Sequence, residues 1–349
     1  MKKSLLALAA LTAFAGAASA QSSVTLFGVV DLSANSVKAG SQSQKVLASN
    51  QMNSNRFGMR GVEDLGGGLK AGFWLEAGMN NADGVAGGAS GNVTPKDANP
   101  ASAQFFNRRS TVSLLGNFGE IRLGRDYIPT FWNIAVFDVN GANGAGEGLN
   151  LHSTLGSGAT TLVRGNNTIA YHLPALGGLY GQFTMAAGEG QTGVKYQGGR
   201  IGYGAGPFSI GAATSVTKTA TSDDFKVTNI GGSYAIGAFT LYGYWNKNTY
   251  GAAEQKVYEI SGSYQLGAGQ IRGSLGKADA TGGAVNGQSA KLWGAGYYYD
   301  LSKRTTVYGL YGSIKNSGGA AFTVLSTQIN AYAKNDTSSA FTLGLKHSF

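Results

Sequence analysis

The residues whose types and spacing could do chemistry in this 349-residue chain are arginines and carboxylates around one irregular segment, residues 124–158. Arg125 lies at the start of that segment, and Arg164 follows shortly after its end. Further upstream, Arg56 and Arg60 share one face of any strand that contains both, because successive strand side chains point to opposite faces. Fixed charges of this kind can create a local electric field that acts on passing ions.

More charged residues lie close to the irregular segment. The period is ambiguous over residues 106–109, so either Arg108 or Arg109 is the inward-facing side chain there. Arg122 is a further basic candidate, and a rim or headgroup contact is the alternative for each of these arginines. The acids that the segment offers to the bases are Asp126, Asp138 and Glu147.

Catalytic and metal-binding chemistry lacks the residues that it needs. The chain has three histidines, no cysteine and no His-Glu-x-x-His motif, so recognisable metal ligands are missing. No Gly-x-Ser-x-Gly elbow leads into a helix. The glycine-rich residues 202–206 lead into Pro207 and another strand, whereas a dinucleotide-binding loop leads into a helix. We therefore expect no enzyme activity, no cofactor and no metal.

The first twenty residues indicate export. Lys2 and Lys3 precede a short apolar run, and the stretch ends in Ala-Ser-Ala at residues 18–20, so residues 1–20 are predicted to be a cleaved signal peptide. Without Lys2 and Lys3, 25 basic residues face 18 acidic ones, a net charge of +7. The basic residues are spread along an exported chain, so a nucleic-acid partner is not expected.

The elements that position these charges are predicted to be strands. In residues 24–33 the even positions are apolar or glycine, while Thr25, Asp31 and Ser33 occupy odd positions. In residues 69–77, Lys70 and Glu76 share the face opposite the apolar side chains. A soluble sandwich would alternate in the same way, so the period alone does not decide the fold.

The connections between the predicted strands decide more. Seven tight, glycine-rich turns alternate with eight longer polar connections, which gives sixteen antiparallel strands. Short turns at one rim and long loops at the other are typical of bacterial outer-membrane barrels, and lipid requires such a sheet to close. We expect one transmembrane barrel over residues 21–349. The short turns are residues 65–68, 116–119, 174–178, 204–207, 235–238, 266–269 and 300–303; the long connections are residues 38–48, 80–103, 126–160, 188–194, 218–224, 246–255, 279–288 and 315–338.

Several motifs across the mature chain resemble the general porins of Gram-negative bacteria, in particular their neisserial and β-proteobacterial branch. They are VTLFGVVD (24–31), NRFGMRG (55–61), EDLGGGLKA (63–71), FNR (106–108), GNFG (116–119), LGR (123–125), YDLSKRT (299–305) and the terminal Phe349. The resemblance implies a homotrimer of 16-stranded antiparallel barrels in the outer membrane. In each barrel, the third external loop folds inward and narrows a water-filled pore.

The resemblance also implies roles for single residues and partners. General porins carry a row of arginines in the pore wall at positions that match Arg56, Arg125 and Arg164. The terminal Phe349 resembles the signal read by the outer-membrane assembly machinery. The other expected partners are outer-membrane lipid, lipopolysaccharide, ions and small hydrophilic solutes.

Charges on inward faces would form the pore constriction. Enteric general porins place Pro-Glu-Phe-Gly at the loop tip, and this chain lacks that run, so Asp138 ranks ahead of Glu147 and Asp126 as the facing acid. At least four arginines against two or three acids predict a weak to moderate anion preference, because charges within about 8 Å of an ion are only partly screened. The predicted basic wall is Arg56, Arg60, Arg125, Arg164, Arg109 and Arg122.

Two questions stay open at this point. The aromatic side chains Phe131, Trp132 and Phe137, with Ile134, either pack the loop against the inner wall or bind a solute, and packing is favoured. The expected function is passive diffusion of ions and small hydrophilic solutes. The alternatives are a solute-selective porin and a plugged structural or adhesive barrel.

Overall fold

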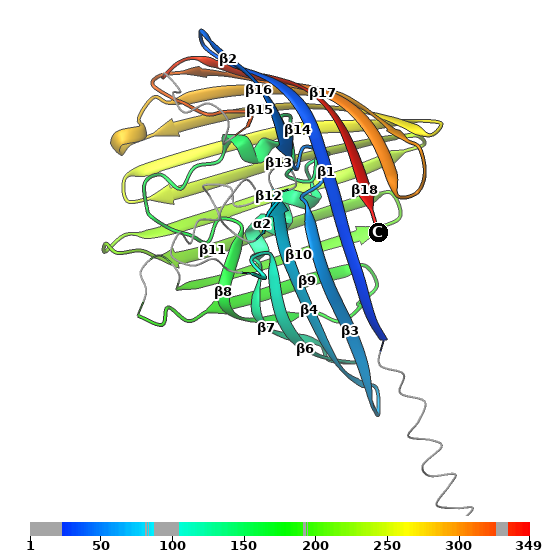
Figure 1. Cartoon of the computed structure of the whole chain (residues 1–349). Helices are drawn as coiled ribbons and strands as arrows, with labels where there is room; N and C mark the ends of the chain where they lie inside the picture. The colour runs from blue at the N-terminus through cyan, green and yellow to red at the C-terminus, as the bar shows by residue number, and fades with distance from the viewer. Residues whose placement is uncertain are drawn as a thin grey trace, which may run out of the picture.

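The computed structural model describes residues 23–80, 82, 84–86, 105–190, 193, 195–325 and 334–349, so the predicted signal peptide lies outside them. The strands form one antiparallel sheet that closes where β1 pairs with β18 (Figure 1). The elements are β1 (Ser23–Ala39), β2 (Gln42–Ser49), β3 (Arg56–Gly66), β4 (Leu69–Asn80), β5 (Val85–Ala86), β6 (Arg109–Gly116), β7 (Gly119–Tyr127), α2 (Pro129–Val136), η1 (Gly148–Leu151), β8 (Arg164–His172), β9 (Leu179–Ala186), β10 (Tyr196–Ala205), β11 (Phe208–Lys218), β12 (Asp224–Ile236), β13 (Phe239–Tyr250), β14 (Ala253–Leu266), β15 (Gly269–Thr281), η2 (Gly283–Val285), β16 (Ser289–Asp300), β17 (Thr305–Ser317) and β18 (Thr337–Ser348).

The predicted 16-stranded barrel is confirmed. β2 and β3 both pair with β1, one along each half of it, so together they occupy one strand position in the barrel. β5 pairs only with the end of β4 and stands apart from the wall. Among the described residues, the eighteen strands therefore fill sixteen strand positions around the barrel. No helix in these residues is long and apolar enough to span a membrane.

Alternating side chains give the wall an apolar outer face and a polar inner face. In β1, Val24 and Leu26 point outward and are 63% and 61% exposed, whereas Asp31 and Ser33 are buried on the inner face. A single strand thereby presents apolar side chains to lipid on the outside and polar side chains to the inside of the barrel. The chain end closes the barrel: Phe349 exchanges backbone hydrogen bonds of 3.0 and 3.1 Å with Gly28, and a Cβ at Gly28 would meet its ring.

All seven predicted short turns connect neighbouring strands of the barrel. Two predicted long connections, residues 38–48 and 246–255, are wrong. Residues 42–49 form β2, which a two-residue turn at residues 40–41 joins to β1, and a second two-residue turn joins β13 to β14 at residues 251–252. Gly40 and Gly251 adopt φ of 58° and 53°, the left-handed backbone that tight turns need. The strands extend further than expected, and their polar residues there resembled a loop.

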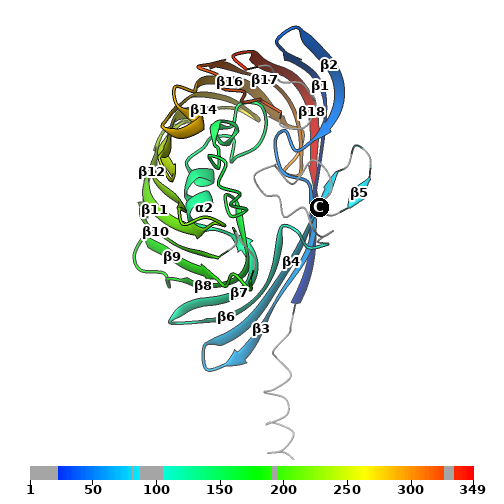
Figure 2. The same cartoon turned by 90° about the vertical axis from the view of Figure 1, so that its left-hand side faces the viewer.

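The third connection, residues 128–163, enters the barrel, and we call it the inward loop. Figure 2 shows its helix α2 inside the ring of strands. Phe131, Ile134 and Phe137 are buried against the wall, as favoured, whereas Trp132 is 41% exposed. Irregular backbone at membrane depth is tolerated where protein or water shields it from lipid.

Candidate pore constriction

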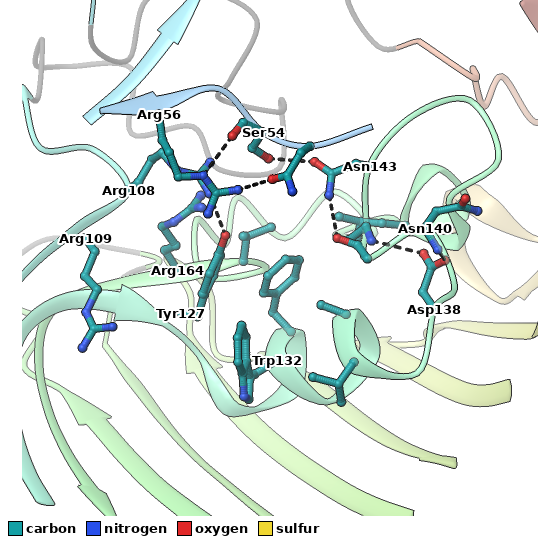
Figure 3. A pocket seen from close by; sticks show the side chains of 18 of the residues that line it. Ser54, Arg56, Arg108, Arg109, Tyr127, Trp132, Asp138, Asn140, Asn143 and Arg164 are labelled. Carbon is teal, nitrogen blue, oxygen red and sulfur yellow. Dashed lines mark hydrogen bonds between the residues drawn. The ribbon is translucent and has the colours of Figure 1, made fainter. Parts of the chain in front are cut away.

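A cavity of about 600 Å³ lies in the lumen beside the inward loop (Figure 3). Its charged lining consists of Arg56, Arg108, Arg109, Arg164 and Arg272 with Glu76, Asp126 and Asp138. Five arginines against three carboxylates leave a formal charge of +2 on this lining. The arrangement can attract and orient anions in the lumen.

Glu76 organises two of the arginines. Its Oε1 accepts a 2.6 Å hydrogen bond from Nε of Arg108 and lies 3.7 Å from Nη1 of Arg56. Its Oε2 accepts a 3.0 Å hydrogen bond from the indole N–H of Trp74. One carboxylate therefore fixes the positions of two guanidinium groups that would otherwise repel each other.

Tyr127, at the end of β7, holds a further pair of guanidinium groups. Its hydroxyl accepts a 3.0 Å hydrogen bond from Nη2 of Arg108, and the guanidinium of Arg164 lies 4.4 Å from its ring centre. On the side of the inward loop, the same ring stacks with Phe131 at 4.8 Å and Trp132 at 5.5 Å. Arg164, which the sequence assigned to the basic wall of the pore, lines the cavity.

Trp74 separates two other predicted arginines. The guanidinium groups of Arg60 and Arg109 lie 4.8 and 4.4 Å from its ring centre, within the range of cation–π attraction. Arg60 pairs directly with Trp74 across β3 and β4, on the same lumen face as Arg56. Arg109 lines the cavity, whereas Arg60 lies next to it without lining it.

Asp126 belongs to the wall and not to the inward loop, which corrects the sequence prediction. It lies in β7, where its Oδ2 is 2.7 Å from Nη1 of Arg122 and 3.4 Å from Nε of Arg109. Arg122 also forms two 2.8 Å hydrogen bonds with Glu120. Arg122 is thus largely neutralised and does not line the cavity.

Arg125 is placed elsewhere than predicted. It lies at a bulge, residues 124–126, which interrupts the alternation of β7, and it does not line the cavity. Its Nε donates to the backbone carbonyl of Asn107 and its Nη1 donates to Oδ1 of Asn166 at 2.7 Å. These two hydrogen bonds tie β7 to residue 107 and to β8 beside the bulge.

The acid of the inward loop that reaches the cavity is Asp138. It accepts hydrogen bonds from the N–H groups of Asn140, Gly148 and Ala142 at 2.7, 3.3 and 3.4 Å. Burial nevertheless raises the pKa of the Asp138 carboxyl, which the three N–H donors oppose. Glu147, the other acid that the sequence predicted for the inward loop, is buried and does not line the cavity.

A chain of buried amides attaches the inward loop to the wall. Nδ2 of Asn133 donates to Gly211 O at 3.1 Å and to Oδ1 of Asn229 at 2.9 Å. Nδ2 of Asn229 donates in turn to Thr130 O at 3.0 Å, and Nε of Arg200 donates to Oδ1 of Asn133 at 2.9 Å. The attachment is therefore polar as well as apolar, which the aromatic residues alone did not indicate.

A second short segment enters the lumen between β2 and β3. Oδ2 of Asp31, a fully buried side chain, accepts 2.7 Å hydrogen bonds from the N–H groups of Met52 and Asn53. Oγ of Ser54 then donates to Oδ1 of Asn143 in the inward loop at 2.7 Å. This segment also accepts a 2.9 Å hydrogen bond from Nε of Arg56 at Ser54 O, so Asp31 indirectly positions that arginine.

Several residues of the site were missed by sequence reasoning. Glu76 had a signal, since it shares a polar face with Lys70, but no pattern paired it with Arg108. Arg108 was weighed only as the alternative to Arg109, and both line the cavity because Arg108 precedes the first residue of β6. Arg272 stood on an inward position of β15 without being singled out. The described residues contain no group of three or more His, Cys, Asp or Glu that could hold a metal.

Comparisons with known proteins agree with this geometry. The chain is 36% identical to outer membrane porin protein 32 of Delftia acidovorans and 26% identical to an outer membrane porin protein of Bordetella pertussis, over the full length of each protein. Its structure resembles an anion-selective porin from Comamonas acidovorans with a TM-score of 0.83 and 31% identity, covering 94% of this chain and all of the other. Residues 7–319 match the Gram-negative porin family. The chain therefore belongs to the Gram-negative porins, as the sequence motifs had indicated, and is an outer-membrane channel protein.

Proposed function

We propose that this porin is a water-filled channel for passive diffusion of ions and small hydrophilic solutes, with a weak to moderate preference for anions. The observation that carries this proposal is the cavity lining of five arginines against three carboxylates. A solved relative is named an anion-selective porin, which supports the same preference here.

Family and fold indicate a channel rather than an enzyme. We infer a homotrimer, with outer-membrane lipid, lipopolysaccharide and the assembly machinery as further partners, and a single barrel domain over residues 21–349 after removal of residues 1–20. Phe349 is proposed as the assembly signal, because it directly follows the closing strand β18 and pairs through its backbone with Gly28. The pore constriction is proposed to comprise Arg56, Arg108, Arg109 and Arg164 with Asp138 opposite them.

Single-channel recording in planar bilayers tests the proposal. Discrete conductance steps are expected in KCl, and replacing chloride by acetate should lower the conductance more than replacing potassium by lithium. Both replacements substitute a slower ion, so the larger loss identifies the ion that carries more current. A larger loss with lithium would contradict the anion preference, and an absence of steps would favour a plugged barrel.

A further inference from the structure

Three lysines form a row across the outer face of the barrel wall, and we call them the lysine row. Lys277 of β15 lies directly opposite Lys291 of β16, which lies directly opposite Lys315 of β17, and the three strands run side by side (Figure 1). All three side chains are exposed. In β15 and β16, Leu275 and Trp293 share their parity and are 61% and 48% exposed on the outer face. The lysine row therefore faces away from the pore.

The lysine row brings like charges together. Residues directly opposite each other in antiparallel strands have Cβ atoms about 5 Å apart, and like charges at such positions are destabilising. Lys277 has a counter-charge, because its Nζ lies 2.6 Å from Oδ2 of Asp279. Within the described part of the chain, Lys291 and Lys315 form no ion pair with a carboxylate. The described residues thus leave the repulsion between these two lysines uncompensated.

A second pair of opposed lysines near the same rim shows how this fold can compensate such a repulsion. Lys247 of β13 lies directly opposite Lys256 of β14. The carboxylate of Glu254 lies 2.5 Å from Nζ of Lys247 and 3.1 Å from Nζ of Lys256. One acid thereby neutralises part of the charge of both lysines. This internal counter-charge distinguishes the pair from Lys291 and Lys315.

The lysine row lies at the rim where the longer connections leave the barrel. Lys277 is close to the end of β15, and Lys291 is close to the start of β16, on either side of residues 282–288. Further into the wall, the ring of Trp293 packs against that of Tyr311, with their centres 5.0 Å apart. Outward tryptophan and tyrosine mark the boundary between hydrocarbon and head groups, and the long loops of such barrels lie outside the cell. The lysine row is therefore at the head-group level of the outer leaflet.

We propose that Lys291 and Lys315, with Lys277 beside them, bind a phosphate group of lipopolysaccharide. The lipid part of this molecule, lipid A, carries phosphate groups at the head-group level, and its acyl chains would lie along the apolar wall below the lysine row. Several oxygens of one phosphate can accept charge-assisted hydrogen bonds from neighbouring ammonium groups. The inference rests on the lipopolysaccharide partner given under the proposed function and names the surface that contacts it.

The test measures binding of diphosphorylated lipid A to the purified porin in detergent by native mass spectrometry. A variant with both Lys291→Gln and Lys315→Gln should bind this lipid at least about fivefold more weakly than the wild type, because one lysine near an anionic lipid surface contributes about that factor. The matched control combines Lys247→Gln with Lys256→Gln. It removes the same charge near the same rim, and its affinity should change less than about twofold, because Glu254 already neutralises part of that pair.

Each outcome supports or overturns the site. Equal binding by the wild type and the Lys291/Lys315 variant would overturn it, and so would an equal loss in the control, because net charge would then explain the effect. Lipid A without its phosphates should bind both proteins alike, and a persistent advantage of the wild type would exclude phosphate as the group recognised. Conductance steps in KCl show that each variant has folded and inserted. A cation preference of the wild-type channel would instead overturn the proposed pore function and leave the lipid measurement unaffected.

Discussion

Arg108 and Glu76 form a buried ion pair in the pore wall, with Nε of the arginine 2.6 Å from Oε1 of the glutamate. The two side chains are only 3% and 8% exposed, and Arg56 shares the same carboxylate at 3.7 Å. The pair therefore has two effects. It orients the arginines, and it cancels part of the positive charge that anions meet.

Replacing Glu76 by glutamine should strengthen anion preference. A unit charge about 8 Å from an ion in water contributes about 0.5 kcal/mol, which is roughly a twofold change in local concentration. We expect the chloride-to-potassium permeability ratio to rise by about that factor. Glu63→Gln is the matched control, since the exposed Glu63 does not line the cavity. An equal rise in both variants would mean that the position of Glu76 is irrelevant.

Replacing Asn229 by alanine should loosen the inward loop. The change removes the hydrogen bonds to Thr130 O and to Asn133 and leaves buried groups without partners, at about 1–3 kcal/mol. Open-channel noise and brief closures should increase in single-channel records. The control is Thr228→Ala at the adjacent position. It removes an exposed hydroxyl contact with Thr214 and should leave the noise unchanged. A quiet Asn229→Ala channel would show that the amide chain does not restrain the loop.

Replacing Gly312 by alanine should narrow the pore. A Cβ at Gly312 would clash with the backbone carbonyl of Ala145, so the tip of the inward loop has to move from the wall toward the lumen. Single-channel conductance should fall. At Gly309, in the same strand, a Cβ would lie 3.2 Å from a flexible side-chain atom of Leu343 and in ordinary contact, 3.9 Å, with Thr342 O, so Gly309→Ala should conduct normally. Unchanged conductance in Gly312→Ala would mean that the loop tip does not limit the current.

Anion preference should depend on pH through Asp138. Burial raises the pKa of this carboxyl, so it is neutral at low pH and becomes charged as the pH rises above the ordinary aspartate range near about 4. The stability of the folded protein should also fall as the pH rises. Burial stabilises the protonated carboxyl in the folded state, and this contribution is lost when the carboxyl ionises. We expect the permeability ratio to fall with rising pH, and to fall less in Asp138→Asn. Identical pH profiles would contradict this assignment.

Much of the barrel could be predicted because each strand has one face toward lipid and the other toward water. Val24 and Asp31 already show the two faces in the sequence, and the glycine-rich turns indicate how many strands there are. The errors at residues 38–48 and 246–255 arose where the strands continue through polar residues, because polarity there does not distinguish strand from loop.

The site was only partly predictable. Arg56, Arg109 and Arg164 were expected at the lumen and line the cavity, but Arg125, which was assigned by resemblance, lies at a bulge and does not line it. The partnership of Glu76 with Arg108 joins residues 32 positions apart. Such pairings depend on strand register and loop entry, which alternation does not specify.

The most direct test of the central claim is the zero-current potential of the wild-type channel across a KCl gradient, measured beside Arg56→Glu. With more chloride than potassium passing, the side with the concentrated salt should become positive, and the variant should shift the potential toward zero or reverse it. A potential of the opposite sign in the wild type would contradict the account, and an unchanged potential in the variant would remove Arg56 from the constriction.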